Sequence, residues 1–100
     1  MSFGVAKELL EQIVRAVSSN PKVQKAVIFG SRARGDCKED SDIDIALYAD
    51  GLTSEELNSI RLLAEEIDTV LKIDILDVER IGRRSLAENI RREGKSIFER

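Results

Sequence analysis

Two short segments of this chain repeat one pattern, in which aspartates alternate with isoleucines or leucines. They are DIDIALY at residues 42–48 and KIDILD at residues 72–77. Alternation with a period of two residues is typical of a half-buried β-strand, because successive side chains point to opposite faces. The pattern therefore predicts two strands that bury isoleucines on one face. On the other face they present carboxylates, Asp42 and Asp44 from the first strand and Asp74 from the second.

The other elements follow from apolar spacing and from the residues that interrupt it. The first helix has Leu9, Leu10, Ile13, Val14 and Val17 on its apolar face, and two strands follow, at residues 23–29 and 42–48. A long helix then runs from the Thr53–Glu56 capping box through Leu71, and a third strand covers residues 72–77. The last helix begins at about Ser85, is interrupted near Gly94 and resumes through Ile97 and Phe98. We therefore expect an α/β (α+β) fold, a small mixed β-sheet covered by helices in the order α-β-β-α-β-α. A chain of this length has room for one hydrophobic core, so we expect a single domain over residues 1–100.

Several absences narrow the chemistry and the setting. The chain has no histidine and one cysteine, Cys37, so zinc sites and Ser-His or Cys-His catalysis are excluded. A net charge of −3 argues against nucleic acid held by bulk electrostatics. Neither a membrane span nor a signal peptide is indicated, and a lone cysteine suits a reducing compartment. We therefore expect a cytoplasmic protein that contacts no membrane.

The acidic face and the turn ahead of it suggest one site. If the two acidic strands lie side by side, three carboxylates converge, and without His or Cys this is an oxygen site that suits Mg²⁺ or Mn²⁺. Alone, the Asp-x-Asp pattern also fits solvated surface acids. The Gly30-Ser31 turn offers backbone N–H groups and a hydroxyl that can hold a phosphate. A phosphate cradle beside a carboxylate-bound metal is typical of phosphoryl transfer.

Two arginines of the same turn leave alternatives open. Arg32 and Arg34 can neutralise a triphosphate, or they can brace the loop against Asp36, Glu39 or Asp40. The ATPase P-loop is excluded, because Asp36 and Cys37 stand where that motif needs Lys and Ser or Thr. Residues 80–100 are basic, which fits either a solvated last helix or a contact surface for a partner or a polyanion.

The motif GSRARG…SDIDI carries a family resemblance. Gly30-Ser31, then ten residues, then Asp42-x-Asp44 resembles the signature of the DNA polymerase β-like nucleotidyltransferases. In a chain of this length it is most similar to the minimal nucleotidyltransferases (MNT), many of which are antitoxins paired with HEPN-domain toxins. The resemblance implies that Asp42, Asp44 and Asp74 hold two Mg²⁺ or Mn²⁺ ions. It also implies that the Gly-Ser turn holds the β- and γ-phosphates of ATP, with Arg32 and Arg34 as further candidates for nucleotide binding.

The resemblance also implies a reaction and a partner. Asp74 would help deprotonate an attacking hydroxyl, and AMP would pass from ATP to a partner protein, on a tyrosine of a HEPN toxin. One alternative is an antitoxin that masks its toxin by contact alone; another is a subunit that modifies a small molecule such as an aminoglycoside. The intact set of three acids favours catalysis. The preferred nucleotide, the number transferred, the acceptor hydroxyl and a homo- or hetero-oligomeric state stay open.

Overall fold

Four strands form one mixed sheet in the order β3-β2-β1-β4. The structure is a computed structural model that describes residues 3–100. Its helices are α1 (Lys7–Ser18), α2 (Ser31–Arg34), α3 (Ser54–Glu65) and α4 (Arg84–Glu93), with a 3₁₀ turn at Val78–Arg80; its strands are β1 (Val23–Phe29), β2 (Ile43–Ala49), β3 (Ile73–Asp77) and β4 (Lys95–Glu99). Strand β1 is antiparallel to β2 and to β4, whereas β2 and β3 are parallel. This confirms the mixed sheet covered by helices.

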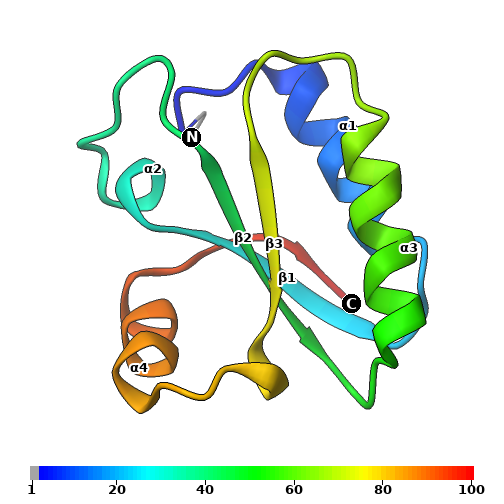
Figure 1. Ribbon diagram of the computed structural model, residues 1–100. Coiled ribbons are helices and arrows are strands. Elements are labelled where there is room, and N and C mark those ends of the chain that lie inside the picture. The colour runs from blue at the N-terminus through cyan, green and yellow to red at the C-terminus, as the bar shows by residue number, and fades with distance from the viewer. Residues whose placement is uncertain (1–2) are drawn as a thin grey trace.

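The helices divide between the two faces of the sheet. Helices α1 and α3 lie side by side on one face, α4 lies on the other, and the short α2 lies beyond the end of β1 (Figure 1). The larger hydrophobic cluster includes Ile43, Ile45 and Leu47 of β2, all fully buried. A smaller cluster beside α4 contains Val27, Ala46 and Ile90. The alternation in β2 therefore buries its isoleucines, as predicted, and leaves Asp44 on the face that α4 only partly covers.

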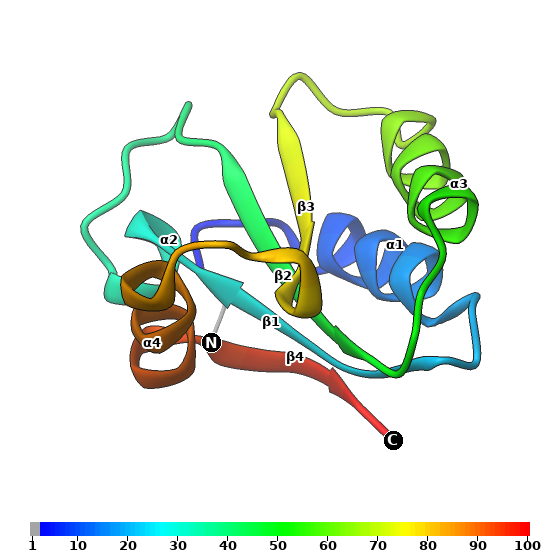
Figure 2. The ribbon, with the colours of Figure 1, turned by 60° about the horizontal axis from the view of Figure 1, so that its bottom comes forward.

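The end of the chain corrects one prediction. Residues Lys95–Glu99, expected to continue the last helix, form strand β4. Helix α4 ends at Gly94, and β4 pairs with β1, which would otherwise have an open edge. Because β1 is buried along most of its length, its backbone N–H and C=O groups need partners on both sides. Figure 2 shows β4 as the outermost strand of the sheet.

Two further boundaries differ from the expectation. The capping box at Thr53 and Glu56 is present and begins α3, but the helix ends at Glu65 rather than extending through Leu71. Ile67 and Leu71 pack against the core from the loop that follows the helix. The turn after Gly30 is itself one short helical turn, α2. Residues 3–100 contain no helix with the length and hydropathy of a membrane-spanning segment.

Candidate active site

The acids of the two alternating segments meet where β2 and β3 begin. The two strands pair in parallel with Asp44 directly opposite Asp74, which confirms that they are neighbours. Asp42 lies one residue before β2 and is exposed. Neighbouring strands lie about 4.7–4.9 Å apart, so directly opposed side chains on one face are close neighbours. The carboxylates of Asp44 and Asp74 therefore share one face of the sheet, and Asp42 lies at the edge of this face, just before β2.

This arrangement is electrostatically unfavourable for Asp44. Burial raises the pKa of Asp44 above its ordinary value, and the negative charges of Asp74 and Asp42 raise it further. Lys72 and Arg32 act in the opposite direction and offset only part of this effect. A group of like charges held together in this way is stabilised by a bound cation.

Gly30 brings the turn directly against Asp44. Its φ of 75° and ψ of −152° lie in a region that is essentially restricted to glycine. A Cβ atom at this position would lie 2.7 Å from Oδ2 of Asp44, so any side chain would collide with the carboxylate. Asp44 also pairs with Phe29, the last residue of β1. The glycine is therefore required both for the bend after β1 and for the space around the carboxylate.

Arg32, a candidate for nucleotide binding, is buried and donates to two backbone segments, residues 3–4 and the loop before β2. The side chain is 2% exposed. Its guanidinium N–H groups donate to the backbone carbonyls of Phe3, Gly4, Glu39 and Ser41, at 2.7–3.2 Å. A guanidinium has five N–H donors, so little capacity is left for a phosphate. The geometry supports loop bracing, the second of the two roles considered for Arg32.

Arg34 lies outside the acidic face. It is half exposed and forms ion pairs at 3.3 Å with Asp36 and with Glu93 of α4. The pair with Asp36 was among the alternatives considered from the sequence. The pair with Glu93 connects α2 to α4 and had no signal in the sequence. Ion pairs of this exposure contribute little to stability.

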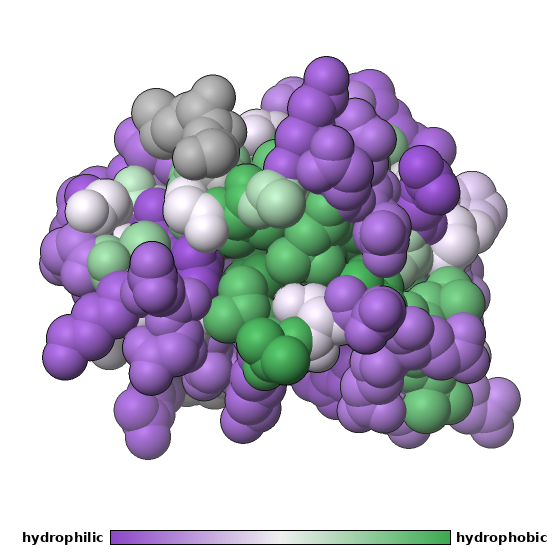
Figure 3. Space-filling view, turned by 90° about the horizontal axis from the view of Figure 1, so that it is seen from above, coloured by the Kyte–Doolittle hydropathy of each residue, from purple (hydrophilic) through white to green (hydrophobic). Residues whose placement is uncertain are grey.

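A groove of about 600 Å³ extends from the acids across strand β3, the edge strand of the sheet. Its lining combines Asp44 and Asp74 with apolar residues, among them Ile67, Leu71 and Ile73. Figure 3 views the side on which β2 and β3 begin and shows an apolar area in its middle, surrounded by hydrophilic residues. The site thus offers charge and an apolar surface side by side.

Two basic residues of the groove were missed in the sequence analysis. Lys72 places its ammonium Nζ 3.7 Å from Oδ1 of Asp74. Arg61 of α3 donates from Nε and Nη2 to the backbone carbonyl of Ile75, at 3.1 and 2.8 Å, and so covers part of the edge of β3. The period-two pattern contains a signal for Lys72, which lies two residues before Asp74 and shares its face. Arg61 binds a backbone group and has no such signal.

The donor chemistry of the face fits a hard divalent cation. Carboxylate oxygens are the ligands that Mg²⁺ and Mn²⁺ prefer, and the absence of a Cβ at Gly30 gives the Asp44 carboxylate the space that it occupies. Within residues 3–100, no three Asp, Glu, Cys or His side chains are arranged to hold a metal ion as they stand. Asp42 is exposed and does not line the groove that Asp44 and Asp74 share, so the three side chains would have to move closer together to hold one ion. The residues therefore fit such an ion in kind and in position along the sheet.

Comparison with known proteins gives one consistent result. The profile of the polymerase beta nucleotidyltransferase (Polbeta) family matches residues 11–100. Two proteins of Methanocaldococcus jannaschii, both named as candidate protein adenylyltransferases, are similar in sequence. MJ1379 is 32% identical over 72 residues, which is 70% of this chain and 72% of that protein. MJ1215 is 51% identical over 39 residues, 39% of this chain and 45% of that protein.

A solved structure shares the architecture. A chain in the crystal structure of a toxin–antitoxin complex with AMP-PNP superimposes with a TM-score of 0.72 at 28% sequence identity. The match covers 91% of the present chain and 73% of that chain. The likeness therefore extends over nearly the whole sheet and its helices.

Proposed function

The chain belongs to the polymerase beta nucleotidyltransferase family, and we propose that it transfers AMP from ATP to a hydroxyl of a partner protein. The observation that carries this proposal is the direct pairing of Asp44 with Asp74 beside the Gly30 turn. The names of MJ1379 and MJ1215 support protein adenylylation. The AMP-PNP complex of the similar toxin–antitoxin structure supports an adenine nucleotide as the donor.

The residues of the proposed site divide between phosphate and metal. Gly30 and Ser31 would receive the β- and γ-phosphates, because the first N–H groups of a helical turn lack intrahelical partners. By analogy with the family, Asp42, Asp44 and Asp74 would hold two ions, either Mg²⁺ or Mn²⁺. Such ions, when bound, neutralise phosphate charge and lower the pKa of a coordinated hydroxyl. Arg32 would act indirectly, by fixing the loop that connects the turn to Asp42.

The reaction balances with groups that this face provides. The acceptor oxygen forms a bond to the α-phosphorus of ATP, and the bond from that phosphorus to the leaving oxygen of pyrophosphate breaks. The proton of the acceptor hydroxyl passes to the carboxylate of Asp74, which lies on the edge strand and faces the groove. Asp44 lies between Asp74 and the Gly30 turn, where the triphosphate would be held. Positioning and charge neutralisation then supply most of the rate enhancement.

The groove supports an acceptor with an apolar body and a hydroxyl at its tip. Tyrosine has this character, and its ring could lie against Leu71 and Ile73 while its oxygen reaches Asp74. We propose a tyrosine of a HEPN-type toxin as the acceptor, which makes this protein an antitoxin of a toxin–antitoxin pair. The toxin–antitoxin assembly of the similar solved structure supports this choice. We further propose that residues 1–100 act as one domain, in the cytoplasm.

The proposal is tested by incubating the protein with Mg²⁺, ATP labelled at the α-phosphate and a lysate of its source cells. The comparison is with the Asp42→Ala/Asp44→Ala variant. The Asp50→Ala/Asp68→Ala variant is the control, because it removes the same charge from two exposed acids outside the site. We expect a labelled protein band with wild type and control that disappears with the active-site variant. Mass spectrometry of the band identifies the acceptor hydroxyl.

The opposite result would support the alternative, in which the protein masks its partner by contact alone. If no band forms, and wild type and Asp42→Ala/Asp44→Ala capture the same partner equally well, the protein masks its partner without transferring AMP. A labelled small molecule in place of a labelled protein would contradict the protein acceptor and leave the transfer chemistry in place.

A further inference from the structure

Lys72 places a positive charge inside the acidic cluster. Its ammonium lies 3.7 Å from Asp74, and its side chain remains 69% exposed on a flexible stem. Lys72 and Asp42 each precede by one residue the first paired residues of their strands, Ile73 and Ile43. The backbone confirms this register, because the N–H of Ile43 donates to the carbonyl of Lys72 at 2.8 Å. Lys72 therefore lies beside Asp42 and on the same face as Asp74.

The arginines around the site already have hydrogen-bond or ion-pair partners. Arg32 donates to backbone carbonyls. Arg34 pairs with Asp36 and Glu93. Arg61, the other basic residue that lines the groove, donates two hydrogen bonds to the backbone carbonyl of Ile75. Lys72 is thus the groove cation that contacts a proposed metal ligand and can also move, because a lysine has a flexible four-carbon stem and a compact, hydrated charge.

We infer that Lys72 is a placeholder cation, which neutralises the acidic cluster while no divalent ion is bound and is displaced when the ion enters with the nucleotide. The inference rests on the proposed function for its metal and its nucleotide. The positive charge of Lys72 repels a divalent ion at the same carboxylates, so the ion binds weakly in the absence of nucleotide. The phosphates of ATP add ligands and negative charge, and the displaced ammonium can turn toward them. Lys72 is a positioning residue in this scheme, and it makes metal loading depend on the nucleotide.

The scheme makes a prediction that an ordinary surface ion pair does not. An exposed Lys–Asp pair contributes little to stability. If the lysine acted only through its fixed charge, its removal would change the Mn²⁺ affinity equally with and without nucleotide. A placeholder, in contrast, competes with the ion. Its removal strengthens metal binding in the absence of nucleotide.

The experiment is a Mn²⁺ titration of the complete chain without nucleotide at about 0.15 M ionic strength, followed by calorimetry or by the relaxation of water protons. Lys72→Met removes the charge and keeps an unbranched side chain, whereas Lys72→Arg keeps the charge. Lys25→Met is the matched control. It changes the net charge equally, but Lys25 lies opposite Tyr48, four residues along β2 from Asp44. That spacing is about 13 Å, beyond the Debye length of about 8 Å.

We expect Lys72→Met to lower the Kd for Mn²⁺ by about three- to tenfold. Lys72→Arg and Lys25→Met should stay within about twofold of wild type. With AMP-PNP present, the gain of Lys72→Met should shrink or reverse. An unchanged Kd in Lys72→Met, or an equal change in Lys25→Met, would overturn the inference. So would the absence of Mn²⁺ binding in every variant.

The outcome can be separated from that of the proposed function. Mn²⁺ affinities that change as expected, without any transfer of AMP, would support the placeholder and contradict the proposed reaction. Transfer of AMP to a protein with an unchanged Mn²⁺ affinity in Lys72→Met would do the reverse.

Discussion

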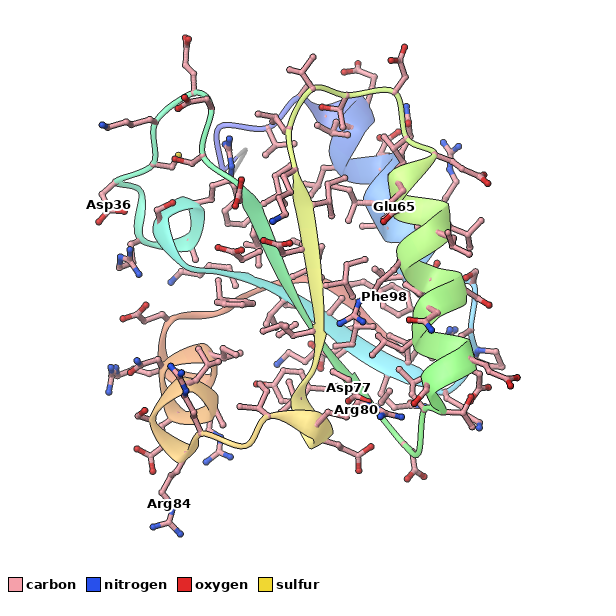
Figure 4. All side chains as sticks on the ribbon, in the orientation of Figure 1. Asp36, Glu65, Asp77, Arg80, Arg84 and Phe98 are labelled. Atoms are coloured by element: carbon pink, nitrogen blue, oxygen red, sulfur yellow. The ribbon has the colours of Figure 1, made fainter. Side chains whose placement is uncertain are left out.

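An aspartate lies near each end of strand β3, and the surroundings of the two differ. At its end, Asp77 is 3% exposed, yet its carboxylate accepts from the N–H of Glu79 at 3.1 Å and pairs with Arg80 at 3.3 Å. Figure 4 shows Asp77 and Arg80 together at the lower end of the strand. At its start, Asp74 faces Asp44, and the pKa of Asp44 is raised by burial and by that neighbour. Asp77 is thus supplied with two donors, whereas at the other end Asp74 has an ion-pair partner, Lys72 at 3.7 Å, and Asp44 lies beside a like charge.

On the proposed function, this difference separates an acid that serves the fold from acids that serve a metal ion. A buried carboxylate that serves the fold is matched by donors, because an unpaired buried charge is costly. Carboxylates that serve a metal ion must keep oxygens available, so the fold bears a cost that the ion later offsets. The comparison therefore predicts opposite results for activity and for stability at the two ends of β3.

The largest expected effect is on activity at the start of the strand. Asp74→Asn should lower the rate of AMP transfer by more than about 100-fold, because a metal ligand and the proposed base are removed together. The free energy of unfolding should change by less than about 0.5 kcal/mol, because Asp74 is partly exposed and its ion pair with Lys72 is at the surface. Transfer of labelled AMP and urea denaturation measure the two quantities. Exposed Asp68→Asn is the control, and an equal loss of activity there would remove the distinction.

The next effect is on stability at the end of the strand. Asp77→Ala should lower the free energy of unfolding by about 2–4 kcal/mol, because the N–H of Glu79 and the guanidinium of Arg80 lose their acceptor. The folded fraction should transfer AMP at the normal rate. Urea denaturation, with activity measured well below the transition, tests both statements. A stable Asp77→Ala protein without activity would mean that both ends of β3 serve the reaction.

A smaller effect is expected at the turn that contacts Asp44. Gly30→Ala should cost about 1–3 kcal/mol, because its backbone conformation disfavours a side chain and the new Cβ would displace the carboxylate of Asp44. Thermal unfolding should show a Tm lower by several degrees, together with weaker Mn²⁺ binding. Gly82→Ala is the matched control, since nothing lies within 4 Å of the Cβ it would add. A Gly30→Ala protein that keeps its Tm and its Mn²⁺ affinity would refute the steric argument.

The smallest effect concerns an acid that is paired at the surface. Hydrogen bonds from Lys22, from the backbone of Thr53 and from Asn20 lower the pKa of Glu56 from 4.5 to about 2. A pKa that is lowered on folding contributes stability above pH 4.5, and this contribution is lost as the pH falls toward 2. Glu56→Gln should therefore be less stable than wild type at neutral pH, and the difference should diminish between these values. A constant difference across this range of pH would contradict the assignment.

The sequence predicts the acidic face better than its surroundings. Alternation in the segments around Asp44 and Asp74 predicts both strands, because a period of two residues has one structural meaning. The capping box predicts the start of α3 for a similar local reason. That the two strands are neighbours was a condition in the sequence and is a finding in the structure.

The rest depends on contacts between distant segments. KSIFE at Lys95–Glu99 does not alternate, and it becomes β4 because β1 has an edge to fill. Arg32 is buried by backbone carbonyls, which leave no pattern in a sequence. The approach of Gly30 to Asp44 depends on the pairing of β1 with β2. The functional roles of all the site residues, and the metal ions, stay predictions.

The most direct test of the account compares wild type with Asp44→Asn in reversible urea unfolding at pH 7, with and without Mn²⁺ and AMP-PNP. The pKa of Asp44 is raised on folding, so its ionisation costs stability as the pH rises above its ordinary value of 3.8. Without ligands, Asp44→Asn should be at least as stable as wild type at pH 7. With ligands, wild type alone should gain stability, because the ion binds the folded carboxylates. A less stable Asp44→Asn protein, or an equal gain in both, would contradict the claim that this acid is kept unpaired for a metal ion.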